Sequence, residues 1–237
     1  MGLDFGIRLM KKDVNEITLV DTNSLPKSLP IINMKDLLLS PLFKDNIGKV
    51  KILAGQDLYL DFYEKADSTW CGDPKNKDVV CDPKKTKETL QIILRVLKEN
   101  PGKFPFSYVV EHNGDSKYTT NSGSVCVGEI YVEKEYVGIK KVYICGGWNR
   151  CYYEVNGKRV DVTKEPIEKL NEIYFQGHSI KTKIIGGKMV ETKGDPLILS
   201  IKKISMYDDF YFRINAIIEL CDYAIKNNYY IQGWFGC

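Results

Sequence analysis

Four cysteines are the residues best suited to metal chemistry. Cys71 and Cys81 lie in one polar stretch, and Cys145 and Cys151 flank a glycine-rich segment. Four thiolates can hold zinc in a tetrahedral site, but zinc sites usually present two ligands separated by two to four residues. Here nine and five residues intervene. The spacing favours structural or incidental thiols, and we predict neither a metal ligand nor a cofactor.

Histidines and carboxylates could support a hydrolase. His112 and His178 sit beside expected turns, where a histidine can act as a general base but is more often simply solvated. Asp57 and Asp61, four residues apart on an expected strand, would share one face with Tyr59. Such a face could bind a divalent cation through oxygen atoms, but a solvated strand face is the more common meaning of this pattern. We therefore name no catalytic residue.

A short motif suggests a second hydrolytic alternative. Glu191-Thr192-Lys193 has the acid-any-lysine form used by one class of metal-dependent nucleases, in which an upstream aspartate completes the magnesium site. Asp161 would have to be that aspartate, across an intervening helix. Because the tripeptide is common by chance, a metal-assisted hydrolase or nuclease is the alternative function and not the main one.

Aromatic side chains are the most unusual resource of this chain, which has 15 tyrosines and three tryptophans. Exposed aromatic rings anchor protein interfaces or stack on nucleotide rings, and the alternative is that they fill the core. Trp148 follows two glycines, which suggests a loop. The candidate residues for contact with a ligand or partner are Trp148, Asn149, Arg150, Tyr152, His112 and Trp234.

Composition argues against several classes of partner. The formal net charge is only +3, from 34 basic and 31 acidic residues, which disfavours nucleic acid. No apolar run approaches the roughly 20 residues that span a bilayer, and the first residues show no leader pattern, so we expect neither a membrane partner nor export. Seven cysteines spread over a long chain indicate reduced thiols and a cytoplasmic location.

Two amphipathic helices are expected to support the fold. The first runs from Thr86 to Asn100, and the second starts at Asp208 or Asp209 and ends near Asn227, because each segment places apolar residues on one helical face. Shorter helical segments are expected at 34–39 and 163–175.

Most other periodic segments predict strands. Asn-Gly and Gly-Gly pairs mark three hairpin turns, at Asn113-Gly114, Asn156-Gly157 and Gly186-Gly187. Residues 66–85, rich in charge, glycine and proline, predict a long exposed loop. The expected strands are 3–9, 17–20, 50–53, 57–63, 106–111, 125–137, 140–145, 151–155, 159–162, 180–185, 188–192 and 197–204.

These elements predict an α+β fold with a mostly antiparallel sheet and the two main helices packed on one of its faces. We expect a single domain over residues 1–237. The segment YYIQGWFGC is too apolar to be a free end, so it should dock on the core or on a partner, which allows a homo-oligomer through this aromatic tail.

The opening Met1-Gly2-Leu3-Asp4, with YDDFYFRINA at residues 207–216 and the aromatic tail, resembles a loose group of uncharacterised small proteins of bacteriophages and bacteria. The chain departs from that group after Asp4, where Met-Tyr is usual. The resemblance implies a mobile-element origin and supplies no site residues.

Together these patterns predict a non-catalytic binding protein, such as a phage accessory or inhibitor protein that binds a host protein or a nucleotide-type ligand. The alternatives are the metal-assisted hydrolase and an oligomeric structural protein.

Overall fold

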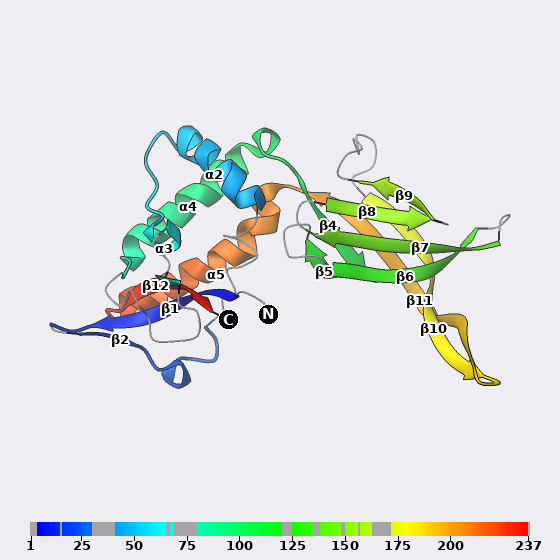
Figure 1. The fold of residues 1–237 in the computed structure, drawn as a ribbon. Coiled ribbons are helices and arrows are strands. Elements are labelled where there is room, and N and C mark those ends of the chain that lie inside the picture. Colours follow the sequence, from blue (N-terminus) through cyan, green and yellow to red (C-terminus); the bar gives the residue numbers. More distant parts are fainter. Residues whose placement is uncertain are drawn as a thin grey trace. The chain divides into compact units, whose positions relative to one another are not determined.

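The chain folds as two compact units in a computed structural model (Figure 1). Unit 1 combines Met1–Pro105 with Met206–Cys237, and unit 2 is the intervening Phe106–Ser205. The single-domain prediction now depends on whether the two units unfold together. The structure describes residues 4–14, 16–29, 41–64, 67–68, 80–119, 125–134, 138–147, 150–155, 157–162 and 172–236.

Unit 1 contains a four-stranded sheet in the order β2-β1-β12-β3. The central strands β1 and β12 are antiparallel, whereas the short β3 runs parallel to β12. Ile231 of β12 is fully buried. The aromatic tail therefore docks on the core of its own chain, which is one of the two arrangements expected from the sequence. The strands are β1 (Asp4–Lys12), β2 (Ile17–Leu19), β3 (Asp67–Ser68) and β12 (Tyr230–Gly236).

Four α-helices complete the described part of unit 1: α2 (Pro41–Ala54), α3 (Asp61–Glu64), α4 (Pro83–Glu99) and α5 (Met206–Lys226). Helix α4 begins where the Asp82 side chain accepts the N–H of Lys84 at 2.9 Å, with Pro83 in the first turn. A 3-10 turn, η2 (Pro101–Lys103), follows this helix. The two predicted amphipathic helices are thus confirmed as α4 and α5.

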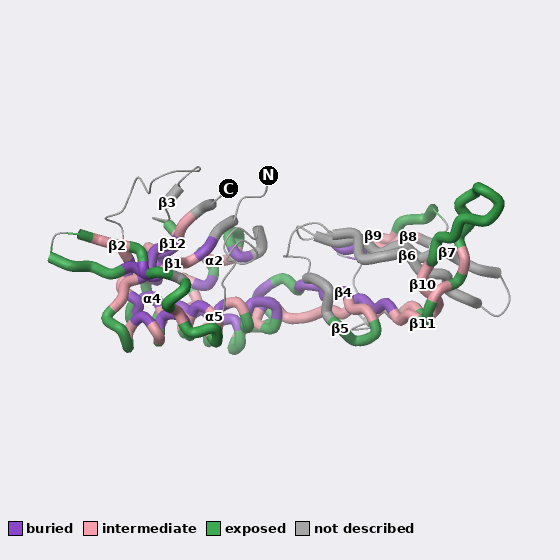
Figure 2. Tube along the Cα trace, turned by 90° about the horizontal axis from the view of Figure 1, so that it is seen from below, coloured by how far each residue is buried: buried purple, intermediate pink, exposed green. Residues whose placement is uncertain are grey.

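The core of unit 1 lies between these helices and the sheet. Buried residues follow α4, α5 and the central strands (Figure 2). Leu90 of α4 and Ile217 of α5 are fully buried, and the ring of Phe43 in α2 packs edge-on against Phe210 at 5.8 Å between centroids. The apolar faces that indicated helices in the sequence therefore form this core.

Unit 2 contains an eight-stranded antiparallel sheet in the order β5-β4-β11-β10-β6-β7-β8-β9. The strands on either side of all three predicted hairpin turns pair antiparallel, and Asn113 has the positive φ of 49° that an Asn-Gly turn requires. The α+β class with antiparallel sheets is confirmed. The strands are β4 (Ser107–His112), β5 (Asp115–Thr119), β6 (Val125–Lys134), β7 (Gly138–Gly147), β8 (Arg150–Val155), β9 (Lys158–Asp161), β10 (Glu172–Ile185) and β11 (Lys188–Ile204).

The hairpin of β10 and β11 extends as a two-stranded ribbon past its neighbours. Among the described residues, β10 pairs with β6 at His178 and Ser179, and β11 pairs with β4 from Leu199 to Ile204. The tip is exposed (Figure 2), and Ile184 and Met189 keep 76% and 79% of their surface accessible.

Several expected elements differ from the structure. The hairpin expected at 50–53 and 57–63 is wrong, because Val50 lies in α2 and the second segment ends in α3. Phe43, Ile47, Val50 and Ala54 recur at helical spacing and pack into the core, a pattern that the β-branched run obscured. The two main helices belong to unit 1, where they pack on the four-stranded sheet.

The boundaries of two other predictions change. Glu172 to Phe175, expected at the end of a helix, are part of β10, while 163–171 lie outside the described residues. The expected loop of 66–85 includes β3 and the start of α4, and its residues 69–79 also lie outside the described chain. The helical segment expected at 34–39 lies there too.

Candidate binding site

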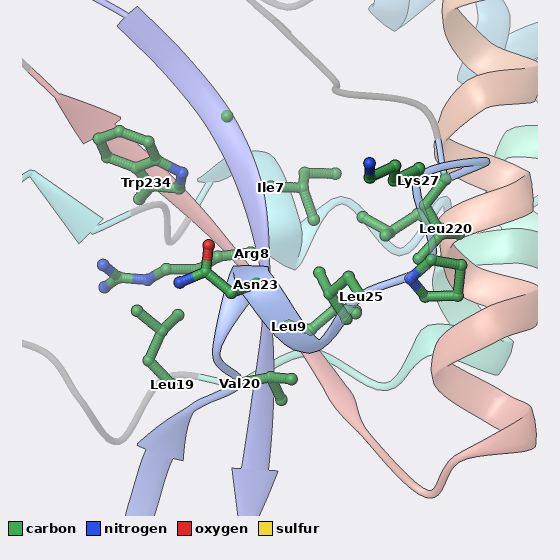
Figure 3. Close-up of a pocket in the computed structure, with 13 residues that line it drawn as sticks. Ile7, Arg8, Leu9, Leu19, Val20, Asn23, Leu25, Lys27, Leu220 and Trp234 are labelled. Atoms are coloured by element: carbon green, nitrogen blue, oxygen red, sulfur yellow. The ribbon is translucent and has the colours of Figure 1, made fainter.

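A cavity of about 800 Å³ lies beside β1 in unit 1 (Figure 3). This β1 pocket has mostly apolar walls, to which β1, the segment after β2, and α5 contribute. Its described apolar walls include Ile7, Leu9, Val20, Leu25 and Leu220. A volume of this size is in the range of small-molecule and peptide-side-chain sites.

The pocket exists because β2 accompanies β1 over only part of its length. The register pairs Met10 with Leu19, and the last contact is a hydrogen bond from the N–H of Val20 to the carbonyl of Leu9 at 3.0 Å. The chain then leaves β1 through a 3-10 turn, η1 (Thr22–Ser24). Within the described residues, no strand of the sheet continues beside Ile7 on this side.

Asp21 fixes this departure of the chain. Its carboxylate accepts the N–H of Asn23 at 2.9 Å, and its carbonyl accepts both the N–H and the hydroxyl of Ser24. Such local hydrogen bonds favour a turn over continued strand pairing. Asp21 thereby brings the following residues, including Asn23 and Leu25, to the far wall of the pocket.

Cationic and amide groups supply the polar part of the lining. Nε of Arg8 donates to Oε1 of Gln232 at 2.8 Å, and the Gln232 side chain is buried, so the guanidinium is held in place by the adjacent strand. Lys27 and Asn23 lie at the exposed rim. None of the described lining residues is acidic, and within the described chain Lys27 makes no ion pair. The described lining therefore combines apolar side chains with two cationic side chains, those of Arg8 and Lys27.

Of the predicted contact residues whose side chains the structure describes, Trp234 alone lines this pocket. It stands opposite Gly6 in the β1–β12 register and is half-buried. Because Gly6 has no side chain, nothing on β1 covers the indole from the opposite position. Figure 3 shows Trp234 and Arg8 on one side of β1 and Ile7 on the other side, towards α5, as strand alternation requires.

His112 and Tyr152 belong to unit 2 and do not contribute to the β1 pocket. His112 ends β4 and is half-buried, next to Asn113, whose side-chain oxygen accepts the N–H of Ile198. The guanidinium of Arg159 stacks on the Tyr152 ring at 3.6 Å.

The remaining contact candidates are not placed by the structure. Trp148 and Asn149 lie outside the described residues, and Arg150 is described only as the first backbone position of β8.

The predicted hydrolytic arrangements do not form among the described residues. Asp57 precedes α3 and Asp61 starts it, so these two carboxylates share no strand face. Glu191 is on β11, whereas Asp161 is on β9, at the far edge of the same sheet with four strands between them. His178 contacts the carbonyl of Gly194 through Nδ1 at 3.2 Å.

The described cysteines are buried thiols. Cys81 belongs to unit 1 and pairs through its backbone with Ile231, whereas Cys151 belongs to the core of unit 2. Cys71 and the side chain of Cys145 lie outside the described residues. No group of three metal-ligating side chains occurs within the described part of the chain.

Sequence reasoning missed most of the pocket residues, including Arg8, Asn23 and Lys27. Each is an ordinary polar residue, and the pocket depends on pairing across more than two hundred positions, as between Arg8 and Gln232. The only local signal was the turn-forming Asp21 and the Pro26 that follow the short second strand.

Comparison with protein-family models, with curated proteins and with solved structures finds no match to this chain. Among the described residues, no helix has the length and hydropathy needed to cross a membrane.

Proposed function

We propose that this protein is a non-catalytic binding protein and that the β1 pocket is its binding site. The observation that carries the proposal is a cavity of about 800 Å³ whose described walls combine apolar side chains with Arg8 and Lys27 and contain no carboxylate. Sites of this kind hold an apolar body by burial and orient it through a few polar groups.

The lining defines the chemistry of the bound group. Trp234 offers a ring face for stacking, and Arg8 and Lys27 favour a negative charge. The ligand or partner therefore presents an apolar or aromatic body next to an anionic group, as a nucleotide-type ligand or an acidic protein segment does.

The proposal extends to an accessory or inhibitor role in the cytoplasm, of phage or mobile-element origin. The buried thiols of Cys81, Cys151 and Cys221, which form no disulfide, support a reducing compartment. The opening residues Met1-Gly2-Leu3-Asp4 support the origin.

A fluorescent probe tests the site. Anilinonaphthalene sulfonate combines an aromatic body with a negative charge, so the native protein should bind it with enhanced dye fluorescence and a changed Trp234 emission. Lys27→Glu should weaken binding about fivefold, equivalent to about 1 kcal/mol, because it reverses an exposed charge at the rim.

Lys158→Glu is the matched control, since Lys158 is an exposed lysine on β9 in unit 2. Equal dye affinity for the two variants, or no binding by the native protein, would contradict the proposed site. Turnover of a phosphodiester or peptide substrate with added magnesium or manganese would instead support the hydrolase alternative.

A further inference from the structure

Among the described residues, no strand pairs with β1 beside Ile7, and this edge of β1 presents main-chain hydrogen-bonding groups to the pocket. In a strand, successive residues direct their N–H and C=O to alternate edges. The carbonyl of Leu9 accepts the N–H of Val20, so the main-chain groups of Leu9 face the β2 side. Alternation places those of Ile7 on the same edge, beyond the point where the register with β2 ends at Met10.

From this edge we propose that the natural occupant of the β1 pocket is an extended segment of a partner protein, which adds as a strand beside Ile7. The inference rests on the proposed function and names its partner class. Strand addition combines main-chain hydrogen bonds to an exposed edge with pockets for alternate side chains. The β1 pocket supplies both features in one place.

The two faces of β1 set the side-chain pattern of that segment. On the face towards α5, Ile7, Leu25 and Leu220 offer an apolar wall. On the opposite face lie Arg8 and Trp234. An added strand projects alternate side chains to the two faces, so apolar residues should alternate with acidic ones.

Length and charge narrow the segment further. The lining portion of β1, Gly6–Leu9, corresponds to about 13 Å of strand at about 3.3 Å per residue, which matches a partner segment of four to six residues. Lys27 at the rim adds a second positive charge to that of Arg8. A partner segment with an acidic residue next to an apolar one would therefore complement the pocket.

The probe is a panel of capped hexapeptides in which aspartate alternates with valine, leucine, isoleucine or phenylalanine. Two matched sets test the mechanism. The first set carries N-methyl groups on the main-chain nitrogens of the two central residues, which removes hydrogen-bond donors and keeps the side chains. The second set replaces each aspartate by lysine, which reverses the charge. Affinity is measured by calorimetry, and protection of the Ile7 amide by hydrogen exchange.

We expect at least one aspartate peptide to bind, N-methylation and the lysine replacement each to weaken it tenfold or more, and the Ile7 amide to gain protection. Lys27→Glu should weaken the aspartate peptide and strengthen its lysine counterpart, while Lys158→Glu should change neither.

Equal affinity for the N-methylated peptide would overturn strand addition. Binding of the naphthalene dye without binding of any peptide would overturn this inference and leave the proposed function standing. Failure of both probes would remove both proposals.

Discussion

Cys221 shows how burial controls a single thiol. It is fully buried in α5, and burial, reinforced by the neighbouring Asp222, raises its pKa to about 12 against the partial opposition of Lys87. The folded state therefore holds the neutral thiol after the unfolded chain has ionised. The stability that the folded state gains by keeping this thiol neutral is fully present below pH 9, and it is lost as the pH rises from 9 towards 12.

We expect Cys221→Ala to reduce the alkaline loss of stability. Between pH 8 and pH 10 the native protein should lose about 1.4 kcal/mol more than the variant, because one proton is released per unfolding event. Urea unfolding at the two pH values measures the difference. The same pH dependence in both proteins would show that this thiol does not control it.

Phe210 and Phe212 form a matched pair on α5. Phe210 is fully buried against Phe43, whereas Phe212 is 80% exposed. Phe210→Ala should destabilise unit 1 by about 3–5 kcal/mol, and Phe212→Ala by less than about 0.5 kcal/mol. Chemical denaturation followed by circular dichroism tests both. Similar losses for the two variants would be incompatible with the described packing of α5.

At the scale of elements, the close approach of β10 and β11 in their ribbon requires a glycine at position 194. The register of the two strands shifts between His178 and Ile180, and a Cβ on Gly194 would lie 2.3 Å from the Ser179 hydroxyl and 3.0 Å from its carbonyl. Gly194→Ala should therefore destabilise unit 2 by about 1–3 kcal/mol.

Gly48→Ala is the control for this substitution. Gly48 lies within α2 and has no atom within 4 Å of its added Cβ, so alanine should stabilise that helix by about 0.5–1 kcal/mol. Thermal unfolding of both variants gives the comparison. A stable Gly194→Ala protein would mean that the ribbon adjusts its register at little cost.

Elements with local signals were predictable, and elements with distant partners were not. The apolar face of α4 and the Asn113-Gly114 turn are encoded within a few residues, and both were predicted. Helix α2 was missed because its β-branched residues around Val50 also suit a strand. The pairing of β1 with β12, and hence the pocket, depends on register between the two ends of the chain, for which a single sequence provides no signal.

At the scale of the whole molecule, each unit has a core of its own. Leu199 and Ile201 are fully buried in unit 2, as Phe210 is in unit 1. We expect two unfolding transitions in calorimetry. Leu199→Ala should lower only one of them and Phe210→Ala only the other. One transition shifted by both variants would instead support the single domain that the sequence predicted.

The insertion of unit 2 between two parts of unit 1 has a consequence for protein synthesis. All strands of unit 2 precede Met206, so this unit has its complete set of strands while the ribosome is still adding α5. The sheet of unit 1 can form only after β12 has been synthesised, because β12 follows every other strand of that sheet and is the neighbour of β1. During translation, β1 and α4 therefore precede their final partners, and their apolar faces stay uncovered until α5 and β12 have been synthesised.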